Sequence, residues 1–273
     1  MDENAARLQL EQEKARVVAM YEAIRNPWQF PRFPDPPREF LPIKQFIDLA
    51  KETVLTHHTK INHPFCVKLY RGEWSRRQLQ AWVLQEYHGV MQTLRNDAHI
   101  VANAGTLEEI REQLMVLIEE AGEDLVGGKY PAHPELFIRF AEGLGLKRET
   151  VTASEPSALM QLIIDDERYR GLRLTIGGLP TNLRLGERIN ALVFPIWADV
   201  LQEKYQVPRQ ALEFFYAHAV DISHGKVGED VLARRVGTYE TQQQIWMQLK
   251  RGQARQWVNY DAYHQAALQA GQQ

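Results

Sequence analysis

The chain has 273 residues, of which 44% are hydrophobic and 25% charged, and its net charge is -3 at pH 7. This composition is typical of a globular protein with room for one large domain or two small ones, and the weak net charge argues against nucleic acid as a partner. The only cysteine is Cys66, which excludes an internal disulfide. No apolar run reaches the roughly 18 residues of a membrane span, and no signal-peptide core is visible, so we expect a cytoplasmic protein that does not bind membranes.

The first part of the chain predicts an amphipathic helix over residues 3–25, followed by a connector. Five of the thirteen prolines fall within residues 26–37, a density that favours an extended segment. We expect Trp28, Phe30 and Phe33 to anchor it on the protein surface, with a partner-binding arm as the alternative. Residues 1–38 are therefore predicted to form an extension, and residues 39–273 the main domain.

The rest of the chain shows helical periodicity and no strand-like alternation. Helices are predicted over residues 40–58, 75–103, 107–121, 134–144, 156–170, 183–205, 210–234 and 239–268, so the predicted fold class is all-α. His57 and His58 are interpreted as ordinary residues, because neighbours in a helix face different sides. His63 precedes Pro64 and is expected to cap the following helix.

Acidic residues occur on faces that should be buried. Glu86 lies within the core stripe of the 75–103 helix, so it should be paired, protonated or bound to metal; a buried salt bridge is the alternative. In the 107–121 helix we expect Leu107, Ile110, Leu114, Leu117, Ile118 and Ala121 to point inward. Glu120 lies at the edge of that face and could reach a cavity, and His133 could turn back toward it or cap the next helix.

A third group of candidate ligands lies late in the chain. His218, Asp221 and His224 are spaced at i, i+3 and i+6, which places them on one helix face at about 100° per residue. Imidazole and carboxylate together suit iron, manganese or zinc. The alternative is a polar helix face that carries two histidines.

Several motifs together resemble the TenA/PqqC-like family over residues 45–250. They are Asn62-His63-Pro64-Phe65, Gly72, Gln78-Leu79-Gln80-Ala81-Trp82-Val83, Ile118-Glu119-Glu120, Phe140-Ala141-Glu142-Gly143-Leu144-Gly145-Leu146 and Asp221-Ile222-Ser223-His224-Gly225. The resemblance implies the heme-oxygenase-like fold, a bundle of seven or more helices around a central cavity.

The chain is similar to one branch of this superfamily, the heme-oxygenase-like diiron oxidases and oxygenases. This branch includes CADD, UndA and SznF, and the resemblance implies a set of metal ligands. Carried over by position, Glu120, His133, Asp221 and His224 match ligands of that branch. His218 matches a further histidine with a shift of one residue, since the family places it at the position of Ala217. The remaining family glutamate falls at Ala191, and Glu187 or Glu86 could replace it.

The resemblance implies a non-haem iron enzyme, with one or two iron ions, that uses dioxygen to oxidise a small organic substrate, and it implies a homodimer. The alternatives are a cofactor-free PqqC-like oxidase and a non-catalytic binding protein with a degenerate site. The PqqC branch is disfavoured because Ala198, Leu201 and Phe214 are apolar where that branch has polar residues. The TenA branch is disfavoured because Cys66 lies too early in the chain.

Overall fold

The computed structural model describes residues 3–173, 179–218, 229–230 and 232–272, with side chains at residues 8, 10–169, 188–218, 229–230 and 232–272. The all-α class is confirmed, since the elements of this described part are helical apart from one isolated bridge between Gly122 and Pro131. The α-helices are α1 (Glu3–Ala23), α2 (Ile43–His57), α3 (Thr59–Asn62), α4 (Pro64–Arg71), α5 (Arg76–Ala102), α6 (Leu107–Gly122), α7 (His133–Gly143), α8 (Arg148–Thr152), α9 (Ala158–Arg173), α10 (Leu179–Tyr205), α11 (Glu213–Ala217) and α13 (Tyr239–Gln272), and the 3-10 helices are η1 (Glu123–Val126) and η2 (Arg209–Leu212). None of the described helices is long and apolar enough to cross a membrane.

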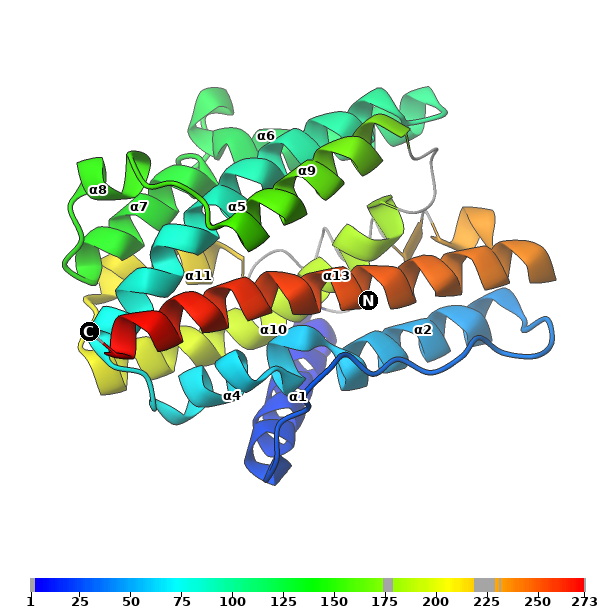
Figure 1. Ribbon diagram of the computed structural model, residues 1–273. Coiled ribbons are helices and arrows are strands. Elements are labelled where there is room, and N and C mark those ends of the chain that lie inside the picture. Colours follow the sequence, from blue (N-terminus) through cyan, green and yellow to red (C-terminus); the bar gives the residue numbers. More distant parts are fainter. Residues whose placement is uncertain (1–2, 174–178, 219–228, 231, 273) are drawn as a thin grey trace.

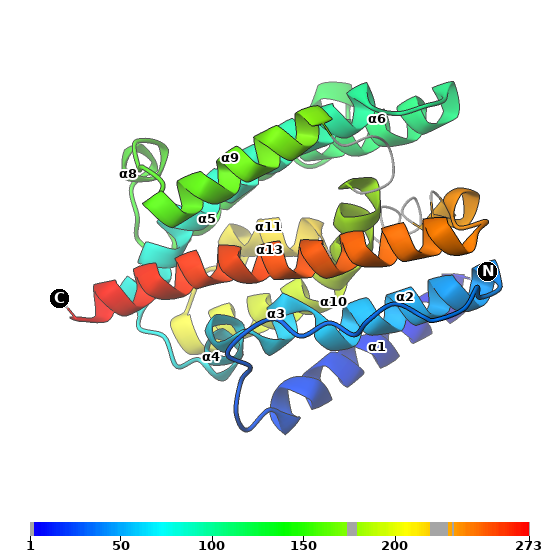
Figure 2. The same ribbon diagram turned by 45° about the vertical axis from the view of Figure 1, so that its right-hand side comes forward.

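The long helix α13 runs through the middle of the bundle (Figures 1 and 2). Helices α5 and α9 pack on one side of it, and α2, α3, α4 and α10 pack on the other. This position requires a helix that is buried on more than one face. Accordingly, α13 buries both large apolar residues such as Trp246 and Trp257 and polar residues such as Gln242 and Gln253.

The start of α5 follows the sequence prediction closely. Ser75 Oγ accepts a hydrogen bond from the Gln78 backbone N–H at 3.3 Å, and the Gln78 side chain accepts one from the Ser75 backbone N–H at 2.9 Å. This reciprocal capping box satisfies donors that a helix start leaves open. The cap sets the rotation of α5, so that Leu79, Trp82 and Val83 enter the core.

The predicted inward face of α6 is wrong. Leu107 and Leu114 are 62% and 42% exposed, whereas Glu109, Gln113 and Glu120 are buried. Glu109 is buried because it forms an ion pair with Arg235 at 2.6 Å and accepts the Gly105 backbone N–H at 2.9 Å. Polar pairing therefore fixes the rotation of α6, and part of its apolar stripe stays at the surface.

The helix predicted over residues 210–234 is interrupted where it is described. Residues 209–212 form η2, and α11 covers only residues 213–217. His218 follows α11 directly, and residues 219–228 lie outside the described part of the chain.

The proline-rich connector packs against the bundle. The Phe33 ring contacts Trp246 edge-on with centroids 5.8 Å apart, and Trp246 Nε1 donates to the Pro34 carbonyl at 3.0 Å. Trp28 lies 5.7 Å from the His57 ring. The predicted anchoring is confirmed for Trp28 and Phe33, whereas Phe30 is 60% exposed and does not contribute.

Candidate metal centre

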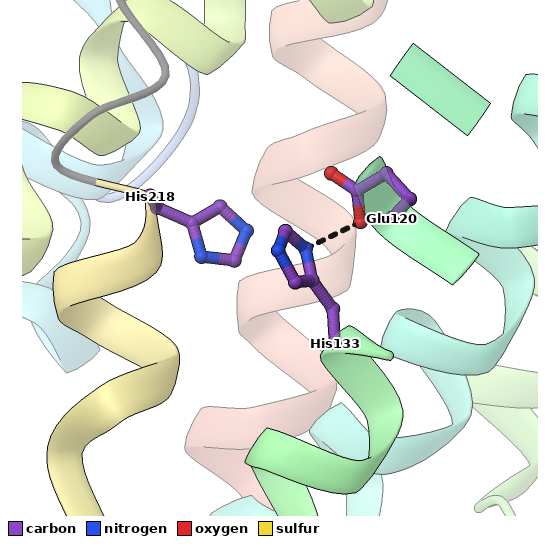
Figure 3. A group of neighbouring side chains, drawn as sticks. All are labelled: Glu120, His133 and His218. Atoms are coloured by element: carbon purple, nitrogen blue, oxygen red, sulfur yellow. Dashed lines mark hydrogen bonds and ion pairs between the residues drawn. The ribbon is translucent and has the colours of Figure 1, made fainter. Parts of the chain in front are cut away.

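Three of the predicted ligands meet inside the bundle, although they come from three different elements (Figure 3). Glu120 lies in the last turn of α6, His133 is the first residue of α7, and His218 follows α11. One ligand atom from each lies within 4.8 Å of the others, and all three side chains are buried. We call this group the Glu120/His133/His218 centre.

The turn between α6 and α7 brings Glu120 and His133 together. His133 Nδ1 and Glu120 Oε2 are hydrogen-bonded at 2.6 Å. Gly122 has φ +125°, and a Cβ there would meet the Ala132 backbone nitrogen at 2.9 Å, so this tight turn requires glycine. His133 does not cap α7, because the N-cap is Ala132; the capping alternative for His133 is wrong.

His218 completes the group from the opposite side. Its Nδ1 lies 2.7 Å from the Phe214 carbonyl oxygen, so Nδ1–H donates and Nε2 keeps its lone pair. The His133 and His218 rings are 4.3 Å apart between centroids. Burial, and secondly the charge of His133, lowers the pKa of His218 to about 3. At neutral pH His218 is therefore an uncharged imidazole, the form that binds metal.

The remaining predicted ligands have different outcomes. Glu86 lies on α5 and lines the same cavity, and it accepts a hydrogen bond from Trp82 Nε1 at 3.1 Å. Within the described residues it is not part of the compact group, so its role as a ligand stays a prediction. Asp221, His224 and the side chain of Glu187 lie outside the described residues.

The family glutamate position offers no carboxylate. Ala191 is buried in α10, and the neighbouring Asn190 lines the cavity instead. The sequence could have indicated Asn190 as a cavity residue, because it is the polar residue directly before the apolar run 191–198.

The centre opens into a cavity of about 170 Å³ lined by residues from α3, α5, α9, α10 and α13. Sequence reasoning missed most of this lining, which includes His58, Lys60, Asn96, Glu167, Arg255, Asn259 and Tyr263. Contrary to the expectation, His57 and His58 do not share one helix: His58 is completely buried and caps α3 by accepting the Lys60 backbone N–H at 3.2 Å. His63 caps α4 as predicted, accepting the Phe65 backbone N–H at 3.0 Å.

Comparison with known proteins shows which of them part of this chain is similar to. Residues 51–164 match the TENA/THI-4/PQQC family. The resemblance predicted from the sequence motifs is therefore confirmed over this segment. Pyrroloquinoline-quinone synthases of Acinetobacter baumannii and Pseudomonas aeruginosa are 36% and 35% identical over 95 residues. These matches cover 35% of this chain and only 36% of the length of each synthase.

Solved structures confirm the heme-oxygenase-like fold of this chain. A domain of unknown function with a heme oxygenase-like fold from Shewanella denitrificans superimposes with a TM-score of 0.63 at 16% identity, covering 82% of this chain and 91% of that domain. A CADD-like protein of unknown function from Nostoc punctiforme gives a TM-score of 0.66 at 13% identity, covering 84% and 98%. The TenA homologue of P. horikoshii gives 0.60 at 16% identity, covering 83% and 100%.

Proposed function

We propose that this protein is a non-haem iron oxidase or oxygenase that uses dioxygen to oxidise a small organic molecule. The observation that supports the proposal most directly is the Glu120/His133/His218 centre, a carboxylate and two imidazoles gathered within 4.8 Å in a buried cavity.

The donor set fits iron. Two histidines and one carboxylate with open positions are the ligand type of non-haem Fe(II) oxygenases. Glu120, His133 and His218 would hold a first ion, and Asp221 and His224 are the candidates for a second. When bound, iron supplies positions at which dioxygen can bind and be reduced.

The protein's own residues orient the ligands and exclude water. The Phe214 carbonyl holds the ring of His218, as hydrogen-bond partners of ligating histidines commonly do. The rings of Phe194 and Phe214 lie 5.0 Å and 4.7 Å from the His218 ring. They form an apolar wall that limits access of water to the centre.

Glu86 is placed to handle protons in this cavity. Burial raises the pKa of the Glu86 carboxyl, so it can hold a proton nearer to neutral pH than an exposed glutamate can. Trp82 Nε1 fixes one of its oxygens at 3.1 Å.

A second candidate function is a cofactor-free oxidase. The identity of 36% over 95 residues to pyrroloquinoline-quinone synthases favours it. This candidate predicts that the protein contains only background iron and that the Glu120/His133/His218 centre binds none.

Iron content separates the two candidates. The protein would be loaded anaerobically with Fe(II), desalted and analysed for metal, alongside His218→Ala and a control, His88→Ala. His88 is half-buried and contacts Ser154 Oγ at 3.1 Å, outside the cavity. We expect about one or two iron ions per chain in the wild type and the control, and loss of iron in His218→Ala. Iron well below one equivalent in the wild type would overturn the proposal.

A further inference from the structure

The cavity is also lined by polar residues outside the Glu120/His133/His218 centre, and we call three of them the polar wall: His58 and the α13 residues Asn259 and Tyr263. Within the described residues, His58 Nε2 is buried without a hydrogen-bond partner, whereas the Tyr263 hydroxyl interacts with Glu86 and Asn259. His58 and Tyr263 are completely buried. Buried polar atoms are normally satisfied, so His58 Nε2 indicates a site for a polar ligand.

The hydrogen bond to the Lys60 backbone determines which chemistry His58 presents. His58 Nδ1 accepts the Lys60 N–H, so Nδ1 carries no proton. The neutral ring must then carry its proton on Nε2, which is the atom in the cavity without a partner. Burial, followed by the charge of Lys60, lowers the pKa of His58 well below its usual value. The ring is therefore a neutral hydrogen-bond donor.

Lys60 adds a positive charge beside this donor. Its side chain lines the cavity, its ammonium contacts Asn190 Oδ1, and it lies 4.1 Å above the Phe194 ring. The same charge lowers the pKa of both His58 and His218. The ammonium is thus close to the polar wall and to the candidate metal centre.

The acidic residues of the cavity are engaged by protein groups. Glu120 is hydrogen-bonded to His133, and Glu167 forms an ion pair with Arg255 and accepts from Asn96 Nδ2 at 2.9 Å. Glu86 is the remaining acid in the lining, and it accepts a hydrogen bond from Trp82 Nε1 at 3.1 Å and interacts with the Tyr263 hydroxyl. The cavity therefore favours an anionic ligand group over a cationic one.

We propose that the cavity binds a carboxylate-bearing substrate, whose carboxylate lies between the Lys60 ammonium and the His58 Nε2–H. Its apolar body would contact Phe194 and Phe214, next to the Glu120/His133/His218 centre. As an assignment of substrate class, this inference rests on the proposed oxidase function. The carboxylate site itself can be tested without metal.

The test uses three probes of similar shape: benzoate, benzamide and benzylamine. Binding to the chelator-treated protein would be measured by ligand-observed NMR and calorimetry. We expect benzoate to bind at roughly 1–10 mM or better, because small ligands gain limited free energy. Its affinity should exceed that of benzamide by about tenfold, the value of a charge-assisted hydrogen bond. Benzylamine should bind most weakly.

Matched lysine variants locate the site. Lys60→Met removes the charge and keeps an apolar stem, and it should abolish the preference for benzoate over benzamide. Lys68→Met is the control, since Lys68 lies 4.8 Å above the Trp74 ring outside the cavity lining; it should bind all three probes like the wild type. His58→Gln, which keeps a donor, should retain part of the preference. Circular dichroism would establish that each variant is folded.

The results decide between clear alternatives. Absence of binding by all probes, benzylamine binding as tightly as benzoate, or an unchanged preference in folded Lys60→Met would each overturn the carboxylate site. Benzoate selectivity in a protein that takes up no Fe(II) would support the site and refute the iron proposal. Iron uptake without benzoate selectivity would support the iron proposal and refute the carboxylate site.

Discussion

Arg255 and Glu167 join the central helix α13 to α9, and their ion pair offers a quantitative test of how the cavity wall is held together. The side chains are only 18% and 13% exposed. Replacing Arg255 by Met would leave Glu167 largely buried without its cation. Breaking a buried pair in this way costs about 3–5 kcal/mol. We expect the lower end, about 3 kcal/mol, because Asn96 still donates to Glu167 and some water reaches the carboxylate.

An exposed pair in the same molecule provides the control. Arg148 Nη1 lies 2.7 Å from Glu135 Oε2, and these side chains are 40% and 33% exposed. Arg148→Met should have little effect on stability, as is typical of exposed pairs. Since 1 kcal/mol changes Tm by roughly 2–4 °C for a chain of similar size, Arg255→Met should lower Tm by about 6–12 °C, and Arg148→Met should lower it clearly less.

Calorimetry on the metal-free proteins would measure both values, with urea unfolding followed by tryptophan fluorescence as a second method. The double variant Arg255→Met/Glu167→Leu removes both charges and should recover most of the loss. A single Arg255→Met variant within about 1 kcal/mol of the wild type would refute the reasoning. So would a double variant that is less stable than the single one.

Three further predictions concern local features. Ser75→Ala should cost about 1 kcal/mol through loss of the α5 cap, measured as a lower Tm; Ser75→Asp, which can still cap, should not, and equal losses would contradict the role of the cap. Gly143→Ala should cost about 1–3 kcal/mol by overpacking, because its Cβ would lie 2.5 Å from the Ala211 Cβ, whereas Gly237→Ala meets nothing within 4 Å and should be nearly neutral. Burial and the nearby charges of His63 and Lys68 lower the pKa of His264 to about 4. The unfolded chain, with a histidine pKa near ~6.5, therefore binds a proton between these values, and stability falls as the pH drops through that window. Tm measured from neutral to acidic pH should fall less steeply for His264→Gln, and identical slopes would contradict this assignment.

The sequence was informative where one local pattern decides the structure. The starts of the helices after Ser75 and after His63 were predicted correctly, because each depends on atoms within a few residues. Glu120 and His133 could be expected to approach each other because a glycine-rich loop joins the end of one helix to the start of the next. The position of His218 beside them came from family resemblance, since nothing local relates residue 218 to residue 120.

The errors arose where long-range pairing overrides a local pattern. The exposed leucines of α6 carry the helical periodicity, yet the ion pair of Glu109 with Arg235, distant in sequence, determines which face is buried. The expectation that His57 and His58 lie in one helix was wrong, because α2 ends at His57 and α3 starts at Thr59. For α13 the sequence predicted a helix over residues 239–268 but did not place its polar residues. Part of its polar face lines a polar cavity inside the protein.

The central place of α13 has a consequence for biosynthesis. Every other described helix precedes α13 in the chain, yet α13 packs against helices on both sides of the bundle (Figure 2). While a ribosome is still making residues before 239, the nascent chain has no helix to fill that place, and the surfaces of α5 and α10 that α13 will cover are open to solvent. Such surfaces favour aggregation. The nascent chain is therefore expected to need chaperone protection until α13 emerges from the ribosome, and to complete its bundle only then.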